Sequence, residues 1–510
     1  MSEQSNNKRI AKNTIYLYIR MFFTMIVSLY TSRVILQKLG VDDFGIYNAV
    51  GGIVGFLSFL NSALATGSSR FLTFELGGGD SERLKRTFSS LLTSHIILSL
   101  LITVIAETIG LWVLYNKMVI PPDRMVAAVV TFHISIITAI ITIIQVPYNA
   151  SIISHEKMEI YAYVSIFEVV SKLAICFLLG IDGEDKLIIY AILICIIHLV
   201  ILLFYIFYSK KNYVETKYKF SLDKEILKPV LSFSGWSLFA DSAIALANQG
   251  VLVLLNMFFA PAVVSARAIS LQVNNAANQF VNNFRTAANP QIVKMFAVGD
   301  FDGSKELLLQ STKFSYYLML LLGLPLFFLA DPILHLWLGE TVPEYTTVFL
   351  QLVIIQSLFQ VFDRSFYTAL YAKGQLKENA LISPTIVFIV FPIIYLFFKA
   401  GYSPVILSWA YLISYAILGV IVKPILIVKY VDYKWSDIIS VYVPCLLVTI
   451  VASVPSFFID LFFNNNSLLE YGIELCLIVS FVLIASYIFG LDKTMRKKLN
   501  TFIATKFKSN

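Results

Sequence analysis

Apolar segments of about 20 residues or more, each long enough to cross a bilayer core, alternate with short polar breaks along the whole chain. The eighth segment is too polar for hydropathy alone and is included because of the repeat described below. We therefore predict an all-α integral membrane protein with fourteen transmembrane helices. The predicted segments are 14–36, 44–72, 88–115, 125–148, 160–179, 187–208, 230–259, 264–296, 307–337, 345–371, 380–398, 403–428, 438–462 and 468–489.

Lysine and arginine are distributed unequally between the two sets of predicted loops. The loops on the side of the N-terminus contain 26 of them, and the loops on the opposite side contain 5. Lys423, Lys429 and Lys434 are counted in the loop that follows the twelfth segment. Cytoplasmic loops carry the excess of basic residues in membrane proteins. The asymmetry predicts a multi-pass protein with both termini in the cytoplasm.

The two halves of the chain resemble each other. The turn LGVDDFG at 39–45 lies over FAPAVVS at 259–265, and at the same offset Gly79-Asp80 lies over Gly299-Asp300. Six segments separate the copies, so both have the same orientation in the membrane, as in a parallel repeat. The predicted organisation is an N-terminal six-helix lobe (1–208), a basic cytoplasmic linker (209–229), a second six-helix lobe (230–430), a terminal helix pair (431–490) and a basic cytoplasmic tail (491–510).

Composition agrees with a lipid-embedded chain and narrows the range of functions. Hydrophobic residues make up 58% and charged residues 14% of the sequence, and mean hydropathy is +0.77, whereas soluble domains carry about 25% charged residues. The net charge of +7 is spread over loops, so we expect no nucleic-acid partner.

Motifs of catalysis and metal binding are not found in the sequence. The four cysteines form no metal-binding pattern, and there is no GxxxxGK[ST], HExxH or GxSxG motif. The run GGGD at 77–80 precedes a predicted helix and is better suited to capping it than to binding phosphate. We expect no enzyme, no metal and no cofactor.

Polar residues of several segments gather on one helical face. At about 100° per residue, six polar residues of segment 264–296 lie within about 80° of one another. They are Arg267, Asn274, Asn278, Asn282, Arg285 and Asn289. Serine and threonine stripes also serve as contacts between helices, but a guanidinium group in the membrane requires an anion or water, and its planar fork suits phosphate oxygens. We predict a wet, cationic cavity between the lobes. Its candidate substrate-binding residues are Arg20, Arg70, Arg267, Asn274, Asn278, Asn282, Arg285 and Arg364.

Acidic residues inside the predicted segments are candidates for coupling transport to an ion. Asp241, Asp363 and Glu107 are suited to carry protons or Na⁺, or else to pair with neighbouring arginines. Glu168 and Lys172 are spaced i, i+4, so we expect this pair to neutralise itself and to be structural.

Several short motifs support a resemblance to a known family. They are Lys12-Asn13-Thr14, the turn Leu39-Gly40-x-x-x-Phe44-Gly45, the basic turn after GGGD at 77–80, and the layout of six, six and two segments. With these features the chain resembles the polysaccharide transporter branch of the multidrug/oligosaccharidyl-lipid/polysaccharide (MOP) exporter superfamily. More narrowly, it is similar to Wzx-type flippases for O-antigen and capsule repeat units. The resemblance implies a MATE-like fold of two pseudo-symmetric lobes, with the last two helices as an extra pair.

The resemblance also implies a function. A flippase of this branch moves an undecaprenyl-diphosphate-linked oligosaccharide, a repeat unit of O-antigen, capsule or exopolysaccharide, from the cytoplasmic to the periplasmic leaflet of the bacterial inner membrane by alternating access. The implied driving force is an ion gradient (H⁺ or Na⁺) or the membrane potential. The expected partners are this glycan, membrane lipid and the glycan polymerase or ligase machinery, and we expect a monomer. Two alternatives remain open, namely a cation-coupled multidrug exporter and a noncatalytic lipid scramblase or scaffold.

Overall fold

The computed structural model is built of helices, and no strand occurs among the residues it describes. The prediction of an all-α membrane protein is confirmed, because eleven of the described helices are long and apolar enough to cross a bilayer. The structure describes residues 22–78, 80–155, 157–179, 185–228, 239, 242–375, 377–463, 467–492, 495–497 and 500–501.

The eleven apolar helices each match one of the fourteen predicted segments. They are Val41–Asn61, Ser81–Asn116, Pro122–Ser154, Glu159–Leu178, Lys186–Asn212, Phe301–Phe328, Thr346–Lys373, Lys377–Lys399, Ile406–Tyr430, Trp435–Phe462 and Leu468–Gly490. The first predicted segment is helical over 22–39, and the seventh contains the shorter apolar helix Ser242–Phe258. The eighth is α11 (Pro261–Ala297), a continuous helix of 37 residues that falls short on hydropathy, as expected. The predicted count of fourteen is compatible with this structure.

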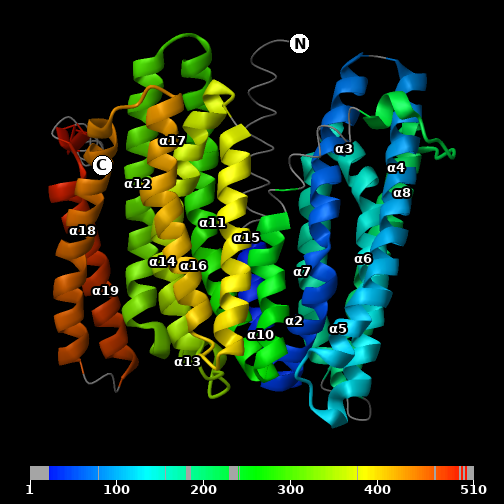
Figure 1. The fold of residues 1–510 in the computed structure, drawn as a ribbon, viewed down its shortest axis with the longest axis horizontal. Coiled ribbons are helices and arrows are strands. Elements are labelled where there is room, and N and C mark those ends of the chain that lie inside the picture. Colours follow the sequence, from blue (N-terminus) through cyan, green and yellow to red (C-terminus); the bar gives the residue numbers. More distant parts are fainter. Residues whose placement is uncertain are drawn as a thin grey trace, which may run out of the picture. The chain divides into compact units, whose positions relative to one another are not determined.

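The chain divides into two compact units, and Figure 1 colours the chain by position along the sequence. Unit 1 contains residues 1–268 and 387–404, and unit 2 contains 269–386 and 405–510. The predicted division into lobes, linker and tail stays a prediction. The elements of unit 1 are α2 (Val41–Phe56), α3 (Ser58–Gly78), α4 (Ser81–Ile105), η1 (Ala106–Gly110), α5 (Leu111–Asn116), η2 (Pro122–Arg124), α6 (Met125–Ser154), α7 (Met158–Leu178), α8 (Lys186–Asn212), η3 (Val214–Thr216), η4 (Leu246–Gly250) and α10 (Val251–Phe258).

Unit 2 has its own set of helices. The segment predicted as one span over 307–337 is divided, since α12 ends at Phe328 and α13 begins at Ala330. Its elements are most of α11, α12 (Phe301–Phe328), α13 (Ala330–Leu338), α14 (Thr346–Lys373), the first part of α15 (Lys377–Lys399), α16 (Ile406–Ala416), η5 (Ile417–Val422), α17 (Lys423–Tyr430), α18 (Trp435–Phe462), α19 (Leu468–Ala485) and η6 (Ser486–Gly490).

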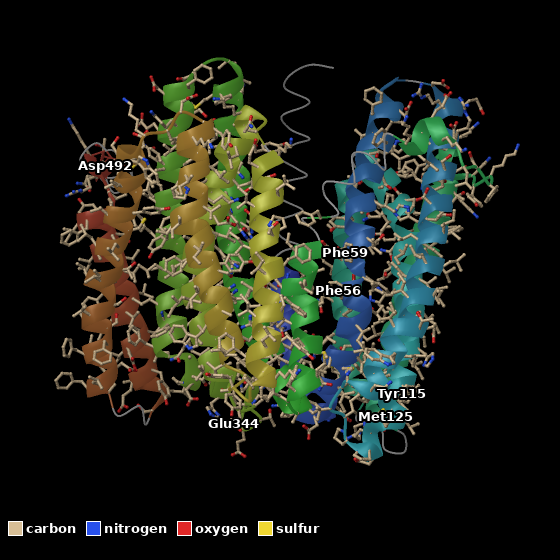
Figure 2. The ribbon with its side chains drawn as sticks, viewed as in Figure 1. Phe56, Phe59, Tyr115, Met125, Glu344 and Asp492 are labelled. Atoms are coloured by element: carbon tan, nitrogen blue, oxygen red, sulfur yellow. The ribbon has the colours of Figure 1, made fainter. Side chains whose placement is uncertain are left out.

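In unit 1, α6 packs against α2, α3, α4 and α8. Its start lies at the same end of the unit as the end of α5, where Tyr115 and Met125 are found (Figure 2). Here Arg124 donates two hydrogen bonds to the carboxylate of Asp43 (2.8 and 2.6 Å) and two to Asp185 (2.5 and 3.1 Å). Partial burial acts to raise the pKa of Asp185, but the hydrogen bonds and charge of Arg124 hold that pKa below its ordinary value. One guanidinium group thus joins three helices.

The basic segment after α8 packs onto unit 1. The buried Glu215 carboxylate is 2.6 Å from His155 Nε2 and accepts a hydrogen bond from Ser151 (3.2 Å), and the His155 ring stacks on Tyr213 at 4.0 Å. Further along, the Oγ atoms of Ser90 and Ser221 are 3.0 Å apart. Residues 213–223 therefore form a docked strap over one end of α4 and α6.

Two positions related by the repeat have the same structural role at helix starts. Asp80 caps α4, because its side chain accepts hydrogen bonds from the backbone N–H groups of Glu82 and Arg83. Asp300 caps α12 in the same way, through the N–H of Gly303 at 2.9 Å. A side-chain oxygen at this position satisfies an N–H group that has no partner within the helix. The predicted capping role of the turn at 77–80 is confirmed at Asp80.

The first turns of α2 and α11 contact each other reciprocally within unit 1. Ser265 Oγ donates a hydrogen bond of 2.6 Å to the carbonyl oxygen of Val41. Conversely, a Cβ atom on Gly45 would lie 2.0 Å from the carbonyl oxygen of Pro261, so the glycine is what allows this approach. Val41 corresponds to Pro261 in the repeat, and Gly45 corresponds to Ser265. We call these four residues the reciprocal contact.

In unit 2, α14 packs against α12, α16 and α17, and the antiparallel pair α18–α19 packs against α12 (Figure 1). Tyr316 OH and Thr449 Oγ1 are 2.8 Å apart, and Tyr317 donates to the carbonyl of Gly490 (3.2 Å). Lys313 Nζ lies 3.3 Å from the carboxylate of Asp492, which is found where α18 begins (Figure 2). The terminal pair is therefore joined to the rest of unit 2 by polar contacts as well as by the apolar core.

Candidate functional site

The polar face of α11 predicted from the sequence faces α14 in unit 2. Asn278 Nδ2 donates to Ser357 Oγ (3.1 Å), and Ser357 Oγ donates to Asn274 Oδ1 (2.8 Å). All three side chains are buried. Hydrogen bonds between helices satisfy polar groups that lipid cannot. Asn274 and Asn278 thus hold α11 against α14, which gives both residues a structural role.

Two arginines follow along the same pair of helices. Arg285 is 8% exposed, and its Nη2 donates a hydrogen bond to the carbonyl oxygen of Arg364. The side chain of Arg364 is exposed, and its Nη1 donates to Asn282 Oδ1 at 3.2 Å. The charges of the two guanidinium groups repel each other. This arrangement favours an anion bound at Arg364, since Arg285 holds the backbone of Arg364 in place.

A buried lysine on α17 completes the site. Lys423 is 2% exposed, yet its Nζ lies 3.2 Å from Asp363 Oδ1 and 5.4 Å from the centre of the Tyr367 ring. Lys423 Nζ also donates a hydrogen bond to Asn379 Oδ1. A charged group is stable in such a place only when it is paired and hydrogen-bonded. These four side chains therefore form one polar cluster on α14, α15 and α17.

The π-helical turn η5 directly precedes Lys423. Such a turn inserts an extra residue into an α-helix and often occurs at functional sites. The carbonyl oxygen of Gly419, a residue of this turn, accepts a hydrogen bond of 2.5 Å from the OH group of Tyr442. A Cβ atom on Gly419 would lie 2.5 Å from the carbonyl oxygen of Phe359, so the turn lies against the backbone of α14. Lys423 thus follows directly on an irregular turn that lies against α14, the helix of Asp363.

The site carries an excess of positive charge. Its three cations are Arg285, Arg364 and Lys423, and among the described residues Asp363 is the carboxylate that pairs with one of them. Three cations and one carboxylate leave two positive charges. Because α11 and α14 lie in a low-dielectric surrounding, these charges attract an anion more strongly than they would in water. The cluster is suited to a diphosphate or another dianion.

The remaining predicted binding residues lie elsewhere. Arg267 is 2% exposed and belongs to the part of α11 in unit 1, so it is separated along the chain from the cluster of Arg285 and Arg364. Arg20 lies outside the described residues. Arg70 lies on α3, but its side chain also falls outside the described part.

The candidate ion-coupling residues have different surroundings. Asp363 is paired with Lys423, rather than with an arginine. Glu107 lies on the π-helical turn η1, with its Oε2 3.4 Å from His133 Nε2, and both side chains are partly exposed. Asp241 lies outside the described residues.

Three charged residues, Glu168, Lys172 and Lys423, show how far sequence patterns predict pairing. The expected structural pair is confirmed, with Lys172 Nζ 2.6 Å from Glu168 Oε1 on α7. The assignment of Lys423 to a loop is wrong, because this residue is buried inside the helix Ile406–Tyr430. The position of Lys423 within the predicted segment 403–428 already indicated that it lies in a helix.

No group of three or more potential metal ligands occurs among the described residues.

Comparisons with known proteins agree on the fold. No family model matches the chain. The "Uncharacterized membrane protein EpsK" of Bacillus subtilis (strain 168) is 20% identical over 366 residues, which cover 71% of each chain. The structure titled "Lipid II flippase MurJ, inward closed conformation" matches with a TM-score of 0.69 and 15% identity, over 93% of this chain and 98% of the other.

Multidrug transporters share the same arrangement of helices. An inward-facing multidrug resistance MATE family transporter of the MOP superfamily matches with a TM-score of 0.67 and 14% identity, over 83% of this chain and 99% of the other. The MATE multidrug transporter DinF-BH matches with a TM-score of 0.60 and 14% identity, over 83% of this chain and 95% of the other. The chain therefore has the all-helical, multi-pass fold that flippases and multidrug transporters of the MOP superfamily share.

Proposed function

We propose that this protein is a flippase that moves an undecaprenyl-diphosphate-linked oligosaccharide across the bacterial inner membrane by alternating access. The observation that carries the proposal is the cationic site of Arg285, Arg364 and Lys423, which retains two positive charges after Asp363 is paired. A diphosphate group needs such an excess of charge when it leaves water. The exposed guanidinium of Arg364 offers a planar fork for phosphate oxygens.

The fold supports this proposal without identifying the cargo. The MurJ structure is titled a lipid II flippase, so the shared helical framework accommodates a lipid-linked cargo in that protein. In our proposal the cargo here is a repeat unit of O-antigen, capsule or exopolysaccharide, and the protein acts as a monomer with both termini in the cytoplasm. A glycan polymerase or ligase would then receive the product on the other side.

The proposal predicts that export depends on both arginines of the site, the buried one and the exposed one. In a strain that lacks the gene, the variant R285Q with R364Q should restore surface glycan at least about tenfold less well than the natural protein, because each lost charge-assisted hydrogen bond is worth about 1.5–3 kcal/mol. The measurement is surface glycan at equal abundance of protein in the membrane. Arg86, an exposed arginine on α4, provides the control variant R86Q. Full export by the double variant would contradict the proposal.

A multidrug exporter is the second candidate, since the fold is shared with MATE transporters. An exporter of cationic drugs needs uncompensated acidic residues at its site. Asp363 does not meet this need, because Lys423 neutralises it. Increased drug sensitivity of the deletion strain, with its surface glycan intact, would favour the exporter over the flippase.

A further inference from the structure

A buried carboxyl group lies in the terminal helix pair, away from the cationic site. Glu474 on α19 is 0% exposed, and neither of its oxygens has a hydrogen-bond donor among the N–H and hydroxyl groups of the described residues. The ionisable group whose charge acts on it is the carboxyl of Asp460, near the end of α18. The buried Glu474 thus has the partly buried carboxyl group of Asp460 as its neighbour.

The lysines of α12, which packs against both α18 and α19, are engaged elsewhere. Lys305 Nζ lies 3.4 Å from Asp437, and Lys313 Nζ lies 3.3 Å from Asp492. Asp437 belongs to the first turn of α18, about 35 Å along that helix from Asp460. Within the described residues, these cations therefore neutralise carboxylates at the other end of the pair.

Two tyrosine hydroxyl groups at η6 are also remote from Glu474. Tyr317 of α12 donates to the carbonyl of Gly490, sixteen positions beyond Glu474 and about 24 Å further along the helix. Tyr487 of η6 donates to Asn500 at the same far end. Neither tyrosine supplies a donor to Glu474.

Neighbouring carboxyl groups in an apolar place cannot both ionise, because burial and their mutual repulsion each favour the neutral form. A protonated carboxyl group donates its O–H to the other, so one proton satisfies both. The other acidic candidates differ, since Asp363 has Lys423 and Glu107 has His133 beside it. Of the three described carboxyl groups of Asp363, Glu107 and Glu474, that of Glu474 is buried with no cationic side chain beside it.

We propose that Asp460 and Glu474 form a proton-binding site in which the two carboxyl groups share one proton. Glu474 lies about 9 Å along the helix from the start of α19, and Asp460 lies two positions from the end of α18. The proton therefore exchanges at the end of the pair where residues 463–467 connect the helices, which the loop charges predict to be outside. The site would couple transport to a proton gradient, and this role alone rests on the proposed function.

Infrared absorption of the purified protein tests the shared proton directly. At about pH 7, exposed carboxyl groups are ionised, so the natural protein should show the absorption band of a protonated carboxyl group. The band should be absent from E474Q, and D460N should shift it. Glu470, on the first turn of α19 and only partly buried, provides the control E470Q, which should keep the band. The same band in E474Q as in the natural protein would overturn the site.

Two further measurements distinguish a bound proton from a bound Na⁺ and test the coupling role. If replacing choline chloride by sodium chloride protects the natural protein against heating, and E474Q loses this protection, the pair binds Na⁺ and the proton site is wrong. If E474Q and D460N export glycan as the natural protein does at every external pH, the coupling role is wrong. A deletion strain with unchanged surface glycan would contradict the proposed flippase, while the infrared band would still identify the proton site.

Discussion

Lys423 lies about 10 Å from the end of its helix, since seven positions separate it from Tyr430. The carboxylate of Asp363, the amide oxygen of Asn379 and the ring of Tyr367 replace the water that it loses. A buried ion pair adds little to stability compared with a well-packed apolar pair, but removal of one partner leaves the other charge without compensation. The pair therefore makes each of its members sensitive to substitution.

We predict that K423Q destabilises the protein by about 3–5 kcal/mol, the usual cost of an orphaned charge in a buried pair. The measurement is thermal unfolding of the purified protein in detergent. The double variant K423Q with D363N should recover most of the loss, because no charge is then left unpaired.

The matched control is K373Q. Lys373 Nζ is 2.8 Å from Asp432, a pair with side chains 37% and 88% exposed. Exposed pairs contribute about 0–1 kcal/mol, so this variant should unfold almost as the natural protein does. Equal effects of K423Q and K373Q would refute the role given to the buried pair.

The sequence predicted part of this site for a physical reason. The residues of α11 share a face because the helix is regular over 37 residues. A projection at about 100° per residue therefore placed Asn274, Asn278 and Arg285 together. The buried position of Lys423 was not predicted, for two reasons. The π-helical turn η5 changes the angular position of the residues that follow it, and a lysine near a helix end resembles a loop residue. Its partners lie on other helices, and hydropathy does not reveal such contacts.

At the scale of elements, the reciprocal contact fixes the first turns of α2 and α11. A Cβ atom on Gly45 would lie 2.0 Å from the carbonyl oxygen of Pro261, and backbone atoms cannot move aside as a flexible side chain can. We predict that G45A destabilises the protein by about 1–3 kcal/mol, as overpacking usually does. Thermal unfolding of the purified variant measures the effect.

The same helix offers a control for this prediction. A Cβ atom on Gly51 would meet nothing within 4 Å. G51A should therefore be neutral or stabilising by up to about 1 kcal/mol, the helix preference of alanine over glycine. A stable G45A would show that α2 and α11 can separate without loss.

The helices themselves were predictable because each must satisfy its backbone internally and present an apolar surface to lipid. The helix α11 was predicted from the internal repeat, because it is too polar to be identified by its hydropathy. Breaks within segments were not predicted, such as Leu57 between α2 and α3. The N–H of Leu57 donates to the carbonyl of Val54 at 3.1 Å, a tightened turn that no pattern of apolar residues encodes.

At the scale of the whole molecule, the described helices and the loop charges together predict which loops lie on each side of the membrane. The burial of Lys423 changes the count from 26 to 25 on the basic side, against 5, and leaves the asymmetry intact. In a cysteine-free background, a membrane-impermeant thiol reagent applied to intact cells should label K117C and K399C. It should not label K217C and K305C until the cells are opened.

Labelling of all four positions from outside would contradict the orientation, and labelling at 217 and 305 alone would invert it. The strap makes position 217 a suitable choice, because the neighbouring Tyr218 OH lies 3.1 Å from Thr93 and keeps the segment on α4.

The reciprocal contact distinguishes a repeat within one chain from a dimer of separate chains. A symmetric dimer of separate chains would place the same residue on both sides of such a contact. In one chain the two sides can differ, and here a glycine at 45 permits a close approach whereas a serine at 265 forms a hydrogen bond. The two positions therefore have different roles, and exchanging Gly45 with Ser265 would not reproduce the contact.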